Sequence, residues 1–262
     1  MRPFILFLLL ILSEVLHSQE HAPRPLTAED YRNWKSIQQE VISSDGKSVV
    51  YEIQPQRGDG VLIYKVPGSA TADTFPRGKK ATVGSHSEFL VFHIQPPLDS
   101  VLAAKRKKVK KEEMPGDSLG IFIASKKELY KYPNVKSYSV AEENGNWIAF
   151  LMTPEHKRDS TSRSSNKKNG KENLVLFNIT TADTLIVHGV ASYHAARKGS
   201  SVMIIREQKD SLQTESRALI FDTNTGVFSE VFRKPGFIIK PVTDETGSKY
   251  AFLFSPDRKS VV

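Results

Sequence analysis

An internal repeat with a period of roughly 40 to 60 residues constrains the fold of this chain more than any other feature. One kind of segment recurs five times, and each copy joins a short polar turn to an apolar run. The copies are SSDGKSVVYEI at 43–53, SHSEFLVFHI at 85–94, ENGNWIAFLM at 143–152, RKGSSVMIIRE at 197–207 and ETGSKYAFLF at 245–254. Four copies place a glycine at the same point of the turn, and the second copy has Ser87 there.

A second kind of segment follows each of the first four copies. These segments are VLIYKVPGSATADTF at 61–75, LGIFIASKKELYKY at 119–132, LVLFNITTADTLIV at 174–187 and ALIFDTNTGVFSEVF at 218–232. Each reads as an apolar strand, a short polar turn and a second strand-like run. Together with the run that enters the next unit, the two segments predict about four antiparallel strands per repeat.

The apolar runs have the pattern of strands, and the later ones are apolar on both faces. In the third copy Ile148, Phe150 and Met152 alternate with Trp147, Ala149 and Leu151, as the two-residue period of a strand requires. Sheets that are apolar on both sides must be covered on both sides, and stacked β-propeller blades meet this requirement. An ordinary β-sandwich is the alternative, because it explains alternation but not a repeated unit.

The sequence therefore predicts an all-β fold, a partial β-propeller of about four to five four-stranded antiparallel blades. The expected units lie near 41–80, 81–136, 137–191, 192–236 and 237–262. Asp-Gly, Asn-Gly, Lys-Gly and Thr-Gly steps, with Gly46, Gly145, Gly199 and Gly247, are expected to supply positive-φ turns. Two basic insertions, 103–117 and 155–172, interrupt the repeats.

The N-terminus has the layout of a secretory signal peptide over residues 1–18. Arg2 precedes an apolar run over 4–12 that is far shorter than the roughly 20 residues a membrane-spanning helix needs. A buried N-terminal helix is the alternative. In the N-terminal segment 19–40, Thr27 is expected to cap a short helix that reaches Trp34. We therefore expect a secreted or periplasmic protein without a membrane span.

The composition of the chain limits the kinds of molecule that it is expected to bind. The chain has no cysteine, so core burial alone must hold the fold together. Its formal net charge is +8, and most of that excess lies in the runs KRKKVKKEE at 105–113 and EHKRDSTSRSSNKKNGKE at 155–172. Neither run is interleaved with aromatic residues for base stacking, so we expect solvated insertions and no nucleic-acid partner.

Gly116-Asp117-Ser118-Leu119-Gly120 matches the G-x-S-x-G pattern of a serine-hydrolase nucleophile elbow. An elbow needs a strand before the serine and a helix after it. Here KKVKKEEMP precedes the match and a β-like run follows it, so the interpretation is a turn entering a strand. The tetrapeptide GDSL also names a class of esterases, but the later Asp-x-x-His of that class is missing. We assign no catalytic role to Ser118.

No cofactor-binding or metal-binding residue is assigned either. Outside the leader, His21, His86, His93, His156, His188 and His194 show no spacing typical of a ligand pair. The acidic pairs Glu112-Glu113 and Glu142-Glu143 could bind a cationic group, with solvated loop acids as the alternative. Asn178-Ile179-Thr180 matches a glycosylation acceptor but lies in an expected strand.

The opening LTAEDYRNWKSIQQEVISSDGKSVVYEI, the glycine-turn strands and the insertion AAKRKKVKKEEMPGDSLGIF resemble the N-terminal propeller of secreted bacterial peptidases of the prolyl oligopeptidase family. The resemblance covers residues 26–262. In that family an α/β-hydrolase domain with Ser, Asp and His follows the propeller, which filters peptide substrates by size. The family's paired-glutamate clamp for amino groups cannot be placed on either acidic pair.

The resemblance implies the N-terminal propeller of a serine peptidase that controls access of peptide substrates to a C-terminal hydrolase domain absent from this sequence. On that interpretation the parent protein is a hydrolase, and these 262 residues alone are inactive. The alternative is a noncatalytic periplasmic propeller, similar to TolB, that binds a protein or a peptide.

Overall fold

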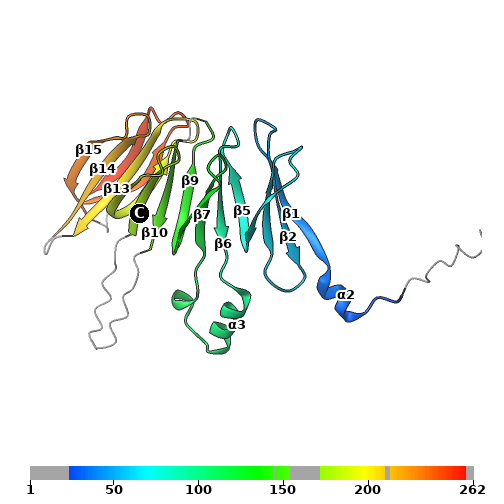
Figure 1. Ribbon diagram of the computed structural model, residues 1–262. Helices are drawn as coiled ribbons and strands as arrows, with labels where there is room; N and C mark the ends of the chain where they lie inside the picture. Colours follow the sequence, from blue (N-terminus) through cyan, green and yellow to red (C-terminus); the bar gives the residue numbers. More distant parts are fainter. Residues whose placement is uncertain (1–23, 144–145, 154–171, 210–212, 258–262) are drawn as a thin grey trace, which may run out of the picture. The chain divides into compact units, whose positions relative to one another are not determined.

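The computed structural model describes residues 24–143, 146–153, 172–209 and 213–257 (Figure 1). Contacts divide the chain into two units, Met1–Trp34 and Lys35–Val262. The expected signal peptide, residues 1–18, lies outside the described residues. None of the helices in the described ranges has the length and apolarity needed to cross a membrane.

The described part of the first unit contains helix α2, Ala28–Asn33, with Thr27 as its N-cap. The Asp30 carboxylate accepts hydrogen bonds from the Thr27 backbone N–H and the Thr27 hydroxyl, both at 2.8 Å. This is the reciprocal half of a capping box, and it holds the start of the helix. The short capped helix predicted from the sequence is confirmed.

The second unit consists almost entirely of antiparallel strands, which we group into five blades. Blade 1 contains β1 (Lys35–Ile42), β2 (Val49–Pro55), β3 (Val61–Lys65) and β4 (Asp73–Pro76). Blade 2 contains β5 (Gly78–Val83), β6 (Phe89–Ile94), β7 (Ser118–Ile123) and β8 (Glu128–Tyr132), with α3 (Leu98–Arg106) and the 3₁₀ turn η1 (Lys111–Glu113) between β6 and β7.

Seven further strands form one continuous sheet that makes up blades 3 and 4. They are β9 (Val135–Val140), β10 (Trp147–Met152), β11 (Glu172–Asn178), β12 (Thr184–Ala195), β13 (Ser201–Lys209), β14 (Thr214–Asp222) and β15 (Val227–Pro235). The first part of β12 pairs with β11 and its last part pairs with β13. Strand β12 is therefore the fourth strand of blade 3 and the first strand of blade 4. Blade 5 contains β16 (Phe237–Thr243) and β17 (Tyr250–Ser255).

Four apolar clusters lie between consecutive blades, which distinguishes this fold from a two-layer sandwich. They join blades 1 and 2, 2 and 3, 3 and 4, and 4 and 5 in turn. Strand β10 shows the principle, because Ile148 and Phe150 face the cluster shared with blade 2 while Ala149 and Leu151 face the one shared with blade 4. The prediction of an all-β partial propeller, built from strands that are buried on both faces, is confirmed.

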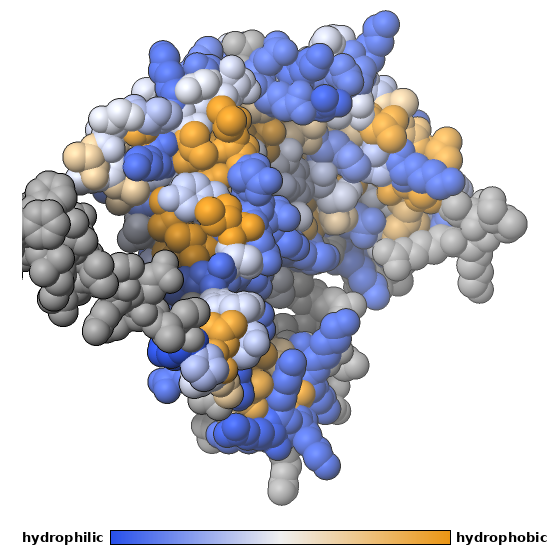
Figure 2. All heavy atoms as spheres, turned by 90° about the vertical axis from the view of Figure 1, so that its right-hand side faces the viewer, coloured by the Kyte–Doolittle hydropathy of each residue, from blue (hydrophilic) through white to orange (hydrophobic). Residues whose placement is uncertain are grey.

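The outward faces of blades 1 and 5 carry exposed apolar side chains. Ile37 and Ile42 are 67% and 69% exposed. Their cross-strand partners place them on one face of the sheet, and Val50 lies on the other face, toward blade 2. Val242 and Leu253 are similarly exposed on blade 5. Figure 2, which looks at the molecule from the side on which blade 1 lies, shows apolar side chains gathered in patches between polar ones.

The repeated turns between the first and second strands use left-handed backbone conformations, as predicted, at two of the glycines. Gly46 and Gly247 both have φ +68, and Ser87 takes φ +61 at the position where its copy lacks the glycine. Gly145 lies outside the described residues. The expectation is wrong for Gly199, which does not have a positive φ; a methyl group there would overlap the Thr246 carbonyl, so close backbone approach is what requires glycine.

Each passage from one blade to the next also contains a left-handed residue. These residues are Arg77 (φ 60), Asn134 (φ 55), Gly189 (φ 71) and Gly236 (φ 132). Three of them are held by backbone hydrogen bonds, for example from the Arg77 N–H to the Gly60 carbonyl at 2.8 Å and from the Thr153 N–H to the Asn134 carbonyl at 3.0 Å. Only two of the four are glycines, so residue type alone does not reveal these junctions.

Candidate functional site

The turns between the first and second strands of the blades lie at one end of the blades, and we call this end the turn face. It contains turns 43–48, 84–88, 141–146, 196–200 and 244–249, of which 144–145 are outside the described residues. Because every blade runs its strands in the same antiparallel order, equivalent turns come to the same end. Hydrogen bonds between neighbouring turns divide this face into two tied groups.

The turns of blades 1 and 2 are joined around the Asp45 carboxylate. The Ser87 and Ser43 hydroxyls donate to Asp45 Oδ1 at 2.6 and 2.7 Å, and the Ser48 hydroxyl donates to Ser87 Oγ at 3.0 Å. These hydrogen bonds, that from Ser87 first, lower the pKa of Asp45 to about 2. The carboxylate is therefore ionised at any pH at which the protein is expected to work.

The turns of blades 3, 4 and 5 are joined through Arg197. Its Nε atom donates to Glu142 Oε1 at 2.6 Å, and its carbonyl accepts from the Glu142 N–H at 2.7 Å. Its Nη1 atom lies 3.5 Å from Glu245 Oε1, and the Lys198 N–H donates to the Glu245 carbonyl at 2.8 Å. The Arg197 hydrogen bond lowers the pKa of Glu142, so this carboxylate is also charged.

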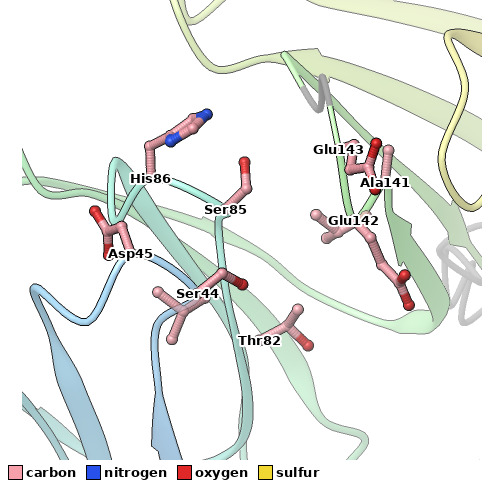
Figure 3. Close-up of a pocket in the computed structure, with 10 residues that line it drawn as sticks. Ser44, Asp45, Thr82, Ser85, His86, Ala141, Glu142 and Glu143 are labelled. Carbon is pink, nitrogen blue, oxygen red and sulfur yellow. The ribbon is translucent and has the colours of Figure 1, made fainter.

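A cleft of about 720 Å³ separates the two groups of turns (Figure 3). In the described ranges no hydrogen bond joins turn 84–88 to residues 141–143. Asp45 and His86 lie on one wall, and Glu142 and Glu143 lie on the other. The full lining is Ser44, Asp45, Thr82, Val83, Ser85, His86, Val140, Ala141, Glu142 and Glu143.

The cleft can accept hydrogen bonds from cationic or N–H groups. Its described lining contains three carboxylates and no lysine or arginine. Asp45 Oδ2 has no hydrogen-bond partner in the described part of the chain, and Lys47 Nζ lies 3.9 Å from it. The Glu143 carboxylate is exposed and forms no ion pair with a described residue. Glu143 is thus the carboxylate with exposed acceptor capacity for a ligand, whereas Asp45 Oδ2 is buried and contributes negative charge.

Ser118 lies at the start of a strand. It is the first residue of β7, pairs with Ile94 and is followed by a strand instead of a helix. Nearby, Asp117 Oδ2 lies 3.7 Å from His93 Nδ1. Burial lowers the pKa of His93, with Asp117 opposing that effect. These surroundings agree with the sequence-based interpretation of a turn that enters a strand.

The remaining candidates that the structure describes do not converge; His21 and His156 lie outside the described residues. The His188 ring is 3.0 Å from Asn173 Oδ1, and burial lowers the pKa of His194 on β12. No group of three or more metal-binding side chains occurs within the ranges that the structure describes. Glu113 belongs to η1, away from the turn face. Asn178 Oδ1 accepts two backbone N–H groups in a tight turn after β11.

Of the two acidic pairs, Glu142-Glu143 is the one that reaches the cleft. Asp45, Thr82 and Ser85 were not singled out from the sequence as site residues. The signal that could have found Asp45 and Ser85 is the repeat itself, because SSDGK and GSHSE occupy equivalent turns of consecutive units. Which of these turns separate and which join depends on side-chain contacts that no short motif records.

Comparisons with known proteins gave structural matches only. No protein-family model matches the sequence, and a search of curated proteins gave no match. The β-propeller domain of the Trilobed protease from Pyrococcus furiosus matches with 9% identity and a TM-score of 0.45, over 87% of this chain and 66% of that one.

Two further solved structures illustrate the range of matches. Acylaminoacyl peptidase from Pyrococcus horikoshii matches with 7% identity and a TM-score of 0.46, over 87% of this chain and 37% of that one. TolB from Acinetobacter baumannii matches with 10% identity and a TM-score of 0.35, over 82% of this chain and 48% of that one. This chain spans less than two thirds of the length of each of the three structures.

Proposed function

We propose that the blades bind the amino-terminal part of short peptides in the turn-face cleft, as the propeller of a secreted serine peptidase similar to the prolyl oligopeptidase family. The observation that carries this proposal is the cleft between blades 2 and 3, whose described lining has three carboxylates, one histidine and no lysine or arginine. The hydrolase domain of such a peptidase would lie outside these 262 residues.

The chemistry of the cleft supports a peptide amino group as the ligand. A protonated amine donates three hydrogen bonds, and the exposed Glu143 carboxylate has free acceptor capacity, while the buried Asp45 Oδ2 adds negative charge. Asp45, whose pKa is lowered to about 2, is ionised at neutral pH and places a negative charge on this side of the cleft, with Lys47 Nζ 3.9 Å from its Oδ2. A cleft of about 720 Å³ is within the size range of small-ligand sites and holds a few peptide residues, but no folded domain.

In this proposal the propeller selects and the partner domain cleaves. The cleft would admit short peptides with a free amino terminus and would exclude folded proteins by size. Hydrolysis would be carried out by a Ser-His-Asp triad on the hydrolase domain, and Ser118 would take no part in it. A propeller similar to TolB, which would bind a protein without any catalytic domain, is the competing function.

Binding of a labelled peptide tests the cleft directly. A tetrapeptide with a fluorophore at its carboxyl end is titrated with the protein, once with a free amino terminus and once acetylated. We expect measurable binding of the free peptide only, and at least tenfold weaker binding by Asp45→Asn or Glu143→Gln. Glu88→Gln is the matched control, because this exposed residue of the second turn does not line the cleft.

Two outcomes would contradict the peptide site. One is equal affinity for the free and acetylated peptides, and the other is unchanged binding by both cleft variants. The peptidase part is tested separately by the coding sequence downstream of Val262. We expect a strand, a G-x-S-x-G segment, a helix, and later an Asp and a His. A reading frame that yields only further blades would favour the protein-binding propeller.

A further inference from the structure

The first basic insertion forms an ordered helical projection at the end of blade 2 opposite to the turn face. Strand β6 begins at turn 84–88 and runs away from it, so α3, which follows β6, lies at the other end (Figure 1). The Leu98 N–H donates to Asp59 Oδ1 at 2.9 Å, which joins the start of α3 to the β2–β3 connection of blade 1. The projection therefore has a fixed attachment to two blades.

The C-terminal end of α3 is closed by a Schellman motif. The Lys108 N–H donates to the Lys105 carbonyl at 3.0 Å, and the Val109 N–H donates to the Ala104 carbonyl at 3.1 Å. Lys108 has φ 51, a left-handed conformation that glycine usually supplies at this position. A lysine is thus present where the backbone favours glycine.

Six cationic side chains surround this motif, and all of them are exposed. Among the carboxylates whose side chains the structure describes, none forms an ion pair with any of the six. The exposed Arg57 of the β2–β3 connection belongs to the same end. Of the carboxylates on the same projection, Asp99 lies in the first turn of α3, and Glu112 and Glu113 follow Lys111 directly in η1. The six are Lys105, Arg106, Lys107, Lys108, Lys110 and Lys111.

Half-buried apolar side chains lie on the same projection. None of them belongs to the four clusters that join the blades, so the core of the propeller does not account for them. They are Leu98, Val101, Leu102, Val109 and Met114. Helical segments that combine apolar and basic side chains bind at the interface of anionic membranes, because both kinds of side chain find partners there.

We propose that α3 and the following residues to Met114 dock this protein on an anionic lipid surface. The six cationic side chains would pair with the negatively charged lipid phosphates. The apolar side chains beside them would enter the boundary between the headgroups and the acyl chains. Nucleic acid would use the cations alone, and residues 98–117 contain no aromatic side chain for base stacking. This proposal is independent of the peptide cleft, which lies on the turn face.

Sedimentation with lipid vesicles tests the proposal. The full chain is mixed with vesicles of phosphatidylglycerol and phosphatidylcholine, or of phosphatidylcholine alone, at 0.1 M salt. Each lysine near an anionic surface contributes roughly a fivefold gain in affinity, so Lys107→Gln/Lys110→Gln/Lys111→Gln is expected to lower the affinity about 100-fold. A matched triple variant replaces three exposed lysines elsewhere, Lys65, Lys131 and Lys249, and is expected to bind like the parent.

The variant Lys108→Gly distinguishes an effect on vesicle binding from an effect on folding. Glycine relaxes the left-handed backbone, so the thermal unfolding temperature is expected to rise, while the lost charge lowers vesicle affinity about fivefold. All variants carry the same N-terminal residues, so differences among them report on the substituted lysines. The proposal is overturned if the triple variant binds as tightly as the parent, if neutral vesicles bind equally well, or if a DNA duplex is bound while anionic vesicles are not.

Discussion

Replacing Gly120 with alanine tests why the G-x-S-x-G match ends in glycine. Gly120 lies in the middle of β7, directly opposite Phe92 of β6. An alanine methyl there would lie 2.7 Å from Phe92 Cζ and 2.8 Å from Cε2. The Phe92 ring is fully buried and lies 4.8 Å from the Phe75 ring, centroid to centroid, so it has little space to move.

The expected cost follows from two opposing effects. Overpacking of a filled core lowers the free energy of unfolding by about 1–3 kcal/mol. Alanine in a strand interior recovers about 0.5–1 kcal/mol relative to glycine. Taking the middle of each range, we therefore expect Gly120→Ala to lower the free energy of unfolding by about 1 kcal/mol, measured by urea denaturation, with an unchanged m-value.

A double-mutant cycle identifies the cause. Phe92→Leu removes the ring atoms that the new methyl group would meet. Gly120→Ala should therefore cost about 1 kcal/mol less in the Phe92→Leu background than in the parent. Additive effects of the two substitutions, or a Gly120→Ala protein as stable as the parent, would refute the packing explanation. The glycine at the end of the G-x-S-x-G match would then need another explanation.

Three further predictions concern blade packing and the turn face. Gly199→Ala should destabilise the protein by at least 1–2 kcal/mol in urea denaturation, because its methyl group would overlap the Thr246 carbonyl in the next turn. Phe150→Ala should cost about 3–5 kcal/mol in the same assay, because it empties a fully buried ring site between blades 2 and 3. Asp45 has a lowered pKa, so its contribution to stability is complete above about pH 4. This contribution should be lost as the pH falls through about 2. The measurement is the difference between the free energies of unfolding of the parent and of Asp45→Asn, determined by urea denaturation from pH 2 to 6.

Each of these predictions has a control. Gly116→Ala should be neutral, since the nearest atom to its methyl group would be Asn134 Oδ1 at 3.7 Å. Val227→Ala, at a side chain that is 57% exposed, should change stability by less than about 0.5 kcal/mol. A difference curve for Asp45→Asn that is flat below pH 4 would show that the serine hydrogen bonds do not lower its pKa.

The sequence was sufficient to predict the blades because their strands are buried on both faces. The alternation in β10 placed Phe150 and Leu151 on opposite faces, and the structure puts them in two different clusters. The same reasoning could not show that β12 serves two blades. Its residues 184–195 include polar and exposed positions, and its role depends on pairing with strands on both sides.

The cleft was less accessible to sequence reasoning than the blades. Its acidic residues lie in short polar turns, where charged side chains are common and usually solvated. The difference between Glu142, paired with Arg197, and Glu143, which keeps a free carboxylate, arises from tertiary contacts 55 residues apart in sequence. Similarly, the left-handed conformation of Ser87 could be inferred only because glycine occupies the equivalent position in other copies.

The left-handed residues between blades have a consequence for how such an array can change. Arg77, Asn134, Gly189 and Gly236 are single points at which the chain passes from one blade to the next. One torsion at each point therefore helps to set the tilt of everything that follows, while the sheets themselves keep their pairing. Replacing one of these residues can change the tilt of a whole blade without changing the packing inside it. This offers a route by which a row of blades can diversify.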